Sequence, residues 1–375
     1  MLPPPRLLAV HCPAGGGHRA AAQAIAEAAA EAGIECEVLD ALELCPPWFA
    51  RAYVGAHLGS SEHAPWLYGA GFHALDRRRG VAVDVRRAID RSLGGRLLQR
   101  VRERAVRAPG LVVIGTHFFP LAALGSARSR GLLSAPLVGV VTDYAAHAFW
   151  AEAGVDRYSV AGRSGRDLVR HGVAASAIAQ VGIPVRPAFA RLLPPRFPGQ
   201  DEPLEVLVTS GGFGVGPLCE VVRSFAALPR DEVRLTVVCG NNPERVAQVR
   251  RVAAAANVDA VVLGFERDMP ARLARAHVVI GKPGGLTASE CLAAGRPMLL
   301  VGACPGQEML NQDWLTLQGA AVACAASSAG ATLRALRSQL PGMSARAAAM
   351  ARPHAARSVV ALAVHELERG ARRAA

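Results

Sequence analysis

A single lysine stands beside a glycine turn in the second half of this 375-residue chain. Lys282 is followed by Pro283, Gly284 and Gly285, and every other basic residue among the 42 is an arginine. A short apolar run precedes this turn, and residues 286–294 have the pattern of a helix. Strand, glycine turn and helix start together bring backbone N–H groups close to a ligand and favour negative charge. The stretch therefore predicts a phosphate site.

Several other stretches would serve the same ligand, which we expect to be a nucleotide-sugar. The glycine turn after the predicted strand 204–209 permits close backbone approach, and Gly264 with Phe265 ends another strand, where an aromatic ring suits a nucleobase. Glu290 is placed to accept hydrogen bonds from ribose, and the loop 304–311 supplies amides and a carboxylate for sugar hydroxyls. Besides those named, the predicted donor-binding residues are Gly211, Gly212, Phe213, Gly214, Leu286, Thr287, Gln307, Glu308 and Asn311.

The first half of the chain carries a histidine at the start of a predicted helix. His18, next to Gly17, is our first candidate for a general base, because an imidazole with an ordinary pKa near ~6.5 can take a hydroxyl proton at neutral pH. Asp143, at the end of a later strand, could orient this base or replace it. The run 15–20 also satisfies G-x-G-x-x-A, with Asp40 ending the next strand, so a nicotinamide-binding site is the competing interpretation.

Two more histidines, His117 and His147, end or follow first-half strands and are candidates for acceptor binding, although a lone histidine is more often structural. The sequence contains no Asp-x-Asp pair, so we expect no metal at the diphosphate and no cofactor beyond the nucleotide-sugar co-substrate. Lys282 and helix dipoles would then stabilise the leaving phosphate.

The elements that position these residues alternate between strand and helix. Residues 7–12, 18–32 and 34–39 read as a βαβ opening, and the pattern restarts after a proline-rich stretch. We expect an α/β protein with a Rossmann-like acceptor- and membrane-binding domain, a linker, a Rossmann-like nucleotide-sugar-binding domain and a terminal helix. Their predicted bounds are 1–185, 186–203, 204–350 and 351–375.

The composition of the chain indicates the cellular compartment and argues against a membrane-spanning segment. Eight scattered cysteines without a Cys-x-x-Cys pair indicate a reduced, cytosolic chain, and the first residues lack the apolar core of a secretory signal. The uncharged window 108–127 contains prolines and glycines and is expected to form a strand and turn rather than a membrane span.

Much of the net charge of +12 lies between residues 76 and 107, which hold eleven arginines against four acidic residues, a difference of +7. Aromatic residues lie just upstream, and such a combination suits shallow insertion into an anionic membrane surface. A solvated helix beside a local core explains the same residues, whereas nucleic acid is disfavoured because no reading module accompanies the charge. The residues predicted at this surface are Trp66, Tyr68, Arg77, Arg78 and Arg79.

Taken in order, these motifs resemble the monogalactosyldiacylglycerol synthase and processive diacylglycerol glucosyltransferase group of glycosyltransferase family 28. The stretches that carry the resemblance are residues 15–20, 65–69, 116–117, 141–143 with His147 and Trp150, 211–217, 282–287 and 305–308. The most specific are Lys-Pro-Gly-Gly-Leu-Thr at 282–287 and Pro-Gly-Gln-Glu at 305–308.

The resemblance implies a GT-B fold of two Rossmann-like domains facing a cleft, with a C-terminal helix crossing back to the first domain. It implies inverting transfer of glucose or galactose from UDP-hexose to a diacylglycerol-like lipid at the inner face of the cell membrane, with His18 as the catalytic residue. Met309 and Leu310 stand where the family usually has an acid and a glycine, which leaves the sugar and the acceptor open. The alternatives are a UDP-sugar transferase with another acceptor and, less favoured, an NAD-dependent oxidoreductase.

Overall fold

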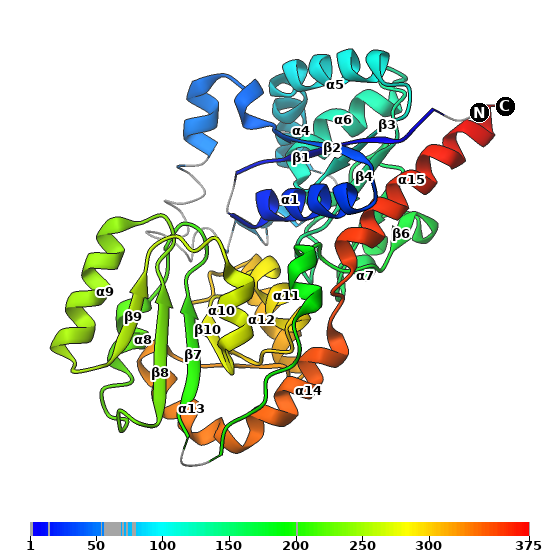
Figure 1. Cartoon of the computed structure of the whole chain (residues 1–375). Coiled ribbons are helices and arrows are strands. Elements are labelled where there is room, and N and C mark those ends of the chain that lie inside the picture. Colours follow the sequence, from blue (N-terminus) through cyan, green and yellow to red (C-terminus); the bar gives the residue numbers. More distant parts are fainter. Residues whose placement is uncertain are drawn as a thin grey trace. The chain divides into compact units, whose positions relative to one another are not determined.

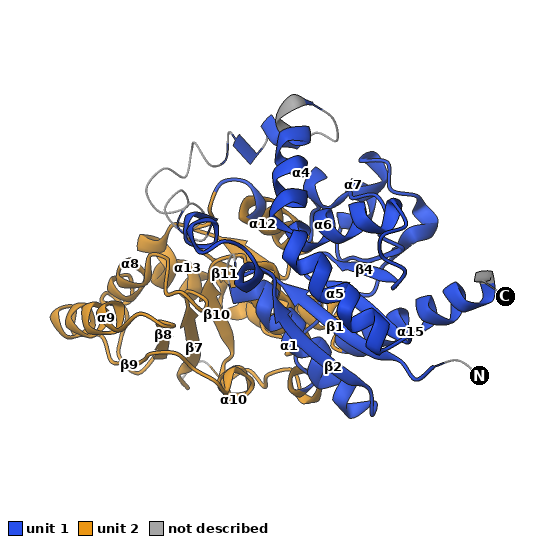
Figure 2. Ribbon diagram, turned by 90° about the horizontal axis from the view of Figure 1, so that it is seen from above, with its two compact units in different colours: residues 1–187, 305–307, 354–375 blue, residues 188–304, 308–353 orange. Residues whose placement is uncertain are grey.

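The chain folds into two compact units, which Figure 2 colours separately. The first unit comprises residues 1–187, 305–307 and 354–375, and the second comprises residues 188–304 and 308–353. The computed structural model describes residues 3–13, 16–53, 55, 69, 71, 72, 74–76, 80–199 and 202–374.

The first unit is built on a six-stranded parallel sheet with the strand order β2-β1-β3-β4-β5-β6 (Figure 1). Its strands are β1 (Arg6–His11), β2 (Glu35–Asp40), β3 (Leu111–Gly115), β4 (Leu137–Val140), β5 (Arg157–Ser159) and β6 (Ile178–Ala179). Side chains alternate between the faces, so Leu8 and Val113 join one apolar cluster while Leu7 and Val112 join another. Both faces are covered, which is why these strands read as continuous apolar runs.

Helices cover the two faces of this sheet. They are α1 (Gly16–Glu31), α4 (Val81–Leu93), α5 (Gly95–Arg107), α6 (Phe118–Ser129), α7 (Ser164–Arg170) and α15 (Ala355–Ala374). The C-terminal helix α15 packs beside α1 through Val359, Val360 and Ala363, which confirms that the end of the chain returns to the first unit. The window 108–127, expected as strand and turn, instead forms β3 and most of α6. Pro120 sits in the first turn of α6, where its missing N–H breaks no helical hydrogen bond.

The second unit contains another parallel six-stranded sheet, with the order β12-β11-β10-β7-β8-β9. Its strands are β7 (Leu204–Thr209), β8 (Val233–Val238), β9 (Ala260–Leu263), β10 (Val278–Gly281), β11 (Met298–Leu300) and β12 (Ala321–Ala323). Counted from the first strand of this unit, the order is that of a dinucleotide-binding Rossmann sheet. The doubly wound α/β class expected from the sequence is therefore present in both units.

The helices of the second unit connect these parallel strands. They are α8 (Leu218–Arg223), α9 (Pro243–Ala255), α10 (Met269–Arg275), α11 (Gly285–Ala293), α12 (Gln307–Leu317), α13 (Ala329–Leu336) and α14 (Leu340–Met350). The first residue of α12, Gln307, belongs to the first unit, and the rest of the helix belongs to the second. Helix α11 ends before Gly295, whose φ of 66° closes the helix in the left-handed conformation expected of glycine.

A buried arginine ties several segments of the second unit together. Arg296 is only 2% exposed and donates hydrogen bonds to backbone carbonyls at the ends of α10 and α11 and in the proline-rich stretch. The acceptors are the carbonyl oxygens of Leu193, Leu273, Ala274 and Ala294. Burial lowers the pKa of Arg296 to about 10, and the carbonyl oxygens supply the polar contacts that its charge requires.

Candidate functional site

Each sheet has one point at which the strand order reverses, between β1 and β3 in the first unit and between β7 and β10 in the second. Open α/β sheets bind ligands beyond the carboxyl ends of the strands at such points. In the first unit the adjoining segments carry His18 and His117, and in the second they carry the glycine turn 211–217 and Lys282. The topology thus brings together the residues that the sequence singled out in each half.

His18 lies in the first turn of α1, and its ring is held by two threonines. Its Nδ1 atom lies 2.7 Å from the carbonyl oxygen of Thr116 and 3.0 Å from Oγ1 of Thr142. Thr116 also donates from Oγ1 to the His18 carbonyl oxygen at 2.9 Å. A carbonyl oxygen only accepts, so the hydrogen of the neutral ring is on Nδ1 and the lone pair is on Nε2. This is the tautomer that a general base needs if Nε2 is to take the proton.

The other two predicted histidines are buried and cap helical turns. Nδ1 of His117 accepts from the Phe119 N–H at 3.0 Å at the start of α6, and its ring centre lies 4.6 Å from that of His18. Nδ1 of His147 accepts from the Phe149 N–H, while its Nε2 lies 2.9 Å from the Phe72 carbonyl oxygen. Burial lowers the pKa of His147 and favours the neutral ring. An acceptor-binding role for either remains a prediction.

Asp143 is half-buried, and its backbone carbonyl accepts a 2.7 Å hydrogen bond from Ser164. Its neighbour Thr142 is the residue whose side chain reaches His18. Thr116 and Thr142 stand in stretches that carry the family resemblance, but sequence reasoning assigned a role only to the residues that directly follow them, His117 and Asp143. Gly17, half-buried beside His18, lies in the same first turn of α1.

The glycine turn of the second unit follows β7 directly. Gly214 has a φ of 70°, and a Cβ atom there would collide with the Cys239 carbonyl, so the close approach of these two segments requires glycine. Gly211 and Phe213 are exposed, whereas Gly212 is half-buried. The turn therefore presents part of its backbone and one aromatic ring at the surface of the unit.

Lys282 lies at the end of β10, before Gly284, which begins α11 without a side-chain cap. Its Nζ atom is 3.0 Å from Oε1 of Glu308, and Oε2 of Glu308 accepts a 2.8 Å hydrogen bond from the Cys304 N–H. The uncapped helix start and the lysine ammonium are the two features an anion site requires.

The remaining predicted residues of α11 and α12 differ in exposure. Leu286, Thr287 and Glu290 are half-buried, and Gly285 is buried. Asn311 is fully buried inside α12. In the first unit, Gln307 donates from Nε2 to the Ala145 carbonyl at 2.8 Å. These donor-binding roles remain predictions.

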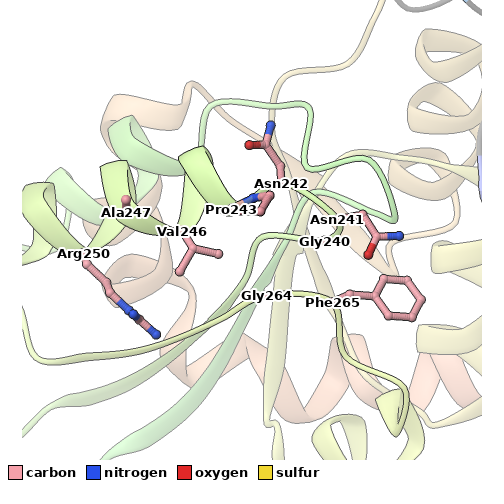
Figure 3. Close-up of a pocket in the computed structure, with 9 residues that line it drawn as sticks. All are labelled: Gly240, Asn241, Asn242, Pro243, Val246, Ala247, Arg250, Gly264 and Phe265. Carbon is pink, nitrogen blue, oxygen red and sulfur yellow. The ribbon is translucent and has the colours of Figure 1, made fainter.

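A cavity of about 530 Å³ opens in the second unit at the ends of β8 and β9 (Figure 3). Gly264 and Phe265, both selected from the sequence, line it, and the Phe265 side chain is 55% exposed rather than packed in the core. Figure 3 shows Asn241 beside Phe265 and Arg250 on the opposite side of the cavity. Neither Asn241 nor Arg250 was selected from the sequence. Asn241 follows Gly240 just beyond β8, a strand-end position that could have indicated it, whereas Arg250 lies inside α9.

The predicted membrane residues Trp66, Tyr68, Arg77, Arg78 and Arg79 lie outside the described residues. Further along the same basic stretch, three arginines are half-buried in ion pairs: Arg86 and Arg87 with Glu152, and Arg104 with Glu37. Five others are exposed on α4 and α5, namely Arg91, Arg96, Arg100, Arg102 and Arg107. The charge run is therefore partly structural and partly surface.

The described residues contain neither a cluster of metal-ligand side chains nor a helix that could span a membrane. Within these ranges, no group of three or more His, Cys, Asp or Glu side chains is placed to hold a metal ion. Among the helices that the structure describes, none combines the length and apolar character needed to cross a bilayer.

Two doubly wound units with glycine turns at their switch points define the GT-B class of α/β proteins, and solved structures share this fold. MurG of Acinetobacter baumannii has a TM-score of 0.62 at 19% identity, with 96% of this chain and 99% of that chain covered. UDP-GlcNAc 2-epimerase from Neisseria meningitidis, solved bound to UDP-GlcNAc, has a TM-score of 0.57 at 11% identity, with 95% and 98% covered. The fold class expected from the sequence is confirmed.

Comparisons of sequence identify the family. Residues 18–185 match the monogalactosyldiacylglycerol (MGDG) synthase family, and residues 205–365 match the glycosyltransferase family 28 C-terminal domain. The chain belongs to this group of glycosyltransferase family 28, as the motifs indicated.

Curated relatives resemble part of the chain. Processive diacylglycerol beta-glucosyltransferase of Bacillus cereus (strain B4264) is 32% identical over 225 residues, which cover 58% of this chain and 56% of that protein. The protein of the same description from Bacillus thuringiensis (strain Al Hakam) is 32% identical over 219 residues, covering 56% and 55%. The match thus spans little more than half the length of these relatives.

Proposed function

We propose that this protein is an inverting glycosyltransferase that moves glucose or galactose from a UDP-hexose to a diacylglycerol-like lipid. The observation that carries the proposal is His18, whose Nδ1 is held by the Thr116 carbonyl so that the neutral ring has its lone pair on Nε2. This residue begins the region that matches the MGDG synthase family, and the second unit matches the family 28 C-terminal domain. The named activity of the Bacillus relatives supports the same assignment.

The second unit would hold the donor. Lys282, the N–H groups at the start of α11 and the exposed backbone of the glycine turn suit the diphosphate. The cavity beside Phe265 suits the nucleobase, since the exposed ring offers a stacking surface. Glu290 is assigned to the ribose hydroxyls, and Gln307 and Asn311 to the sugar, whereas Glu308, predicted with them from the sequence, pairs with Lys282. The same fold accommodates UDP-GlcNAc in the Neisseria epimerase.

The proposed reaction is a single displacement. Nε2 of His18 takes the proton from the acceptor hydroxyl, and the oxygen attacks the anomeric carbon as the bond from that carbon to the diphosphate oxygen breaks. The bonding electrons leave with UDP, whose added negative charge Lys282 and the α11 dipole stabilise. Attack opposite the leaving group inverts the anomeric centre. Asp143 is kept as an alternative base, which the variants below distinguish.

A membrane-bound acceptor requires a surface that reaches lipid. Val85 and Ile89 of α4 are exposed one helical turn apart, and Arg91 and Arg96 are exposed close by in sequence. Apolar side chains beside exposed cations favour shallow binding to an anionic bilayer. We assign this face to peripheral association with the inner face of the cell membrane.

The test is transfer of labelled sugar from UDP-glucose and from UDP-galactose to diacylglycerol in anionic vesicles. His18→Ala should retain UDP binding and lower turnover by about 10²- to 10⁴-fold, whereas Lys282→Ala should weaken UDP binding. Asp143→Asn with near-normal turnover would leave His18 as the base, and the reverse result would move the assignment to Asp143. No product from either donor would refute the lipid assignment, and the lipids of expressing cells would then be examined for another acceptor.

A further inference from the structure

The ammonium of Lys282 is paired with a carboxylate at the place where the donor diphosphate would bind. Nζ of Lys282 lies 3.0 Å from Oε1 of Glu308, and the two side chains are 18% and 25% exposed. Lys282 is the only lysine of the chain, so Glu308 is the partner of the one ammonium side chain that the sequence contains. With Glu308 ionised, the pair carries no net charge.

The Glu308 carboxylate is also fixed in position. Its second oxygen, Oε2, accepts a 2.8 Å hydrogen bond from the N–H of Cys304 at the end of the loop that follows β11. Glu308 itself lies in the first turn of α12. Both oxygens therefore have protein partners, and moving the carboxylate away from Lys282 would break the bond to the Cys304 backbone.

We propose that Glu308 is the counter-charge of Lys282, which positions the ammonium and weakens the binding of UDP. The proposal rests on the proposed function, because it concerns the diphosphate of that donor. A phosphate oxygen that contacts Lys282 must lie close to a carboxylate of like charge, and in a half-buried setting this repulsion is only partly screened. The nucleotide released by the reaction carries more negative charge than the donor does, so the repulsion acts most strongly on the product.

This role differs from that of a sugar ligand. A carboxylate that grips sugar hydroxyls would strengthen binding of UDP-hexose and leave UDP nearly unaffected. A counter-charge weakens both, and its removal makes binding tighter and more sensitive to salt, because the site then has a net positive charge. The salt dependence would not change if Glu308 served only to stabilise the fold.

The experiment compares wild type with Glu308→Gln, which keeps the size of the side chain and an oxygen that can accept from Cys304. Calorimetry with UDP should show affinity about three- to tenfold tighter in the variant, with a steeper loss of affinity between low and high salt. Glu205→Gln is the matched control. The Glu205 side chain is 27% exposed and pairs with Arg234 near the amino end of β7, whereas Lys282 follows the carboxyl end of the neighbouring parallel strand β10. Its loss should therefore leave UDP affinity unchanged.

Inorganic pyrophosphate provides a second probe, because its binding needs no uridine site. Tighter pyrophosphate binding by Glu308→Gln would support the counter-charge even if UDP did not bind and the donor assignment failed. Unchanged or weaker affinity for both anions, or a selective loss of UDP-glucose binding, would overturn the proposal. If thermal unfolding shows that the glutamine variant is not folded, Glu308→Asp replaces it, because the shorter side chain moves the carboxylate away from Lys282 by one methylene. This variant should bind UDP more tightly than wild type by a smaller factor, and an unchanged affinity would contradict the proposal.

Discussion

Replacing Thr142 by valine tests whether the hydroxyl that contacts His18 assists the proposed proton transfer. Thr142 Oγ1 lies 3.0 Å from Nδ1, which also has the Thr116 carbonyl at 2.7 Å. A hydrogen bond to a neutral ring contributes about 1 kcal/mol, and one to a charged ring about 1.5–3 kcal/mol. Because His18 becomes positive as it takes the proton, we expect the variant to lose about 1–2 kcal/mol of transition-state stabilisation.

That loss corresponds to a fall in kcat/KM of about 5- to 30-fold. The loss should stay below that of His18→Ala, because the Thr116 carbonyl still fixes the tautomer. The assay is sugar transfer to diacylglycerol in vesicles at saturating donor, with UDP affinity measured in parallel and expected to be unchanged. Thr142→Ser, which keeps the hydroxyl, is the control and should retain most of the activity. Full activity in the valine variant, or an equal loss in both variants, would refute the role assigned to the hydroxyl.

Three further predictions concern stability and membrane binding. Arg296→Ala leaves several buried carbonyls without a donor and should lower the free energy of unfolding of the second unit by about 3–5 kcal/mol in urea titrations. The unfolding of the first unit should be unchanged. Burial lowers the pKa of His11 from 6.5 to about 4, so the neutral ring is favoured in the folded state. The stability that depends on this neutral ring is fully present above pH 6.5 and is lost as the pH falls toward 4. His11→Asn should remove about 3 kcal/mol of that acid sensitivity, which unfolding at several pH values measures. Ile89→Glu should weaken binding to anionic vesicles about tenfold without changing UDP affinity.

The parts of the fold that the sequence predicted are those where one physical signal decides the outcome. Strand β7 was predicted with its observed bounds, because a parallel strand covered on both faces reads as an uninterrupted apolar run. The helix pattern of residues 286–294 ends just before Gly295, whose positive φ disfavours other residues, and α11 ends one residue earlier, at Ala293. By contrast, α6 was missed after β3 because Pro120 suggested a turn, although a proline in a first helical turn is tolerated.

The candidate site was predictable as a set of segments but not as a set of contacts. Strand-end motifs identified His18 and Lys282, whereas their partners Thr116, Thr142 and Glu308 depend on which strands are neighbours. The pairing of β1 with β3 places Thr116 beside the start of α1, a relation between residues almost a hundred positions apart. Local sequence carries no information on such a distance, so the contacts with these partners could be assigned only from the sheet order.

The same reasoning explains why the donor half is better specified than the acceptor half. A diphosphate requires cations and backbone N–H groups, and Lys282 with the uncapped start of α11 meets that requirement through fixed backbone positions. A lipid chain requires only apolar surface, which many side chains supply equally well. Arg86 shows the consequence: it lies in the basic stretch, yet it stacks 4.0 Å from the Phe149 ring centre and pairs with Glu152. Charge and aromatic content alone therefore cannot separate a membrane surface from a structural cluster, and Ile89→Glu tests a position that is exposed in the structure.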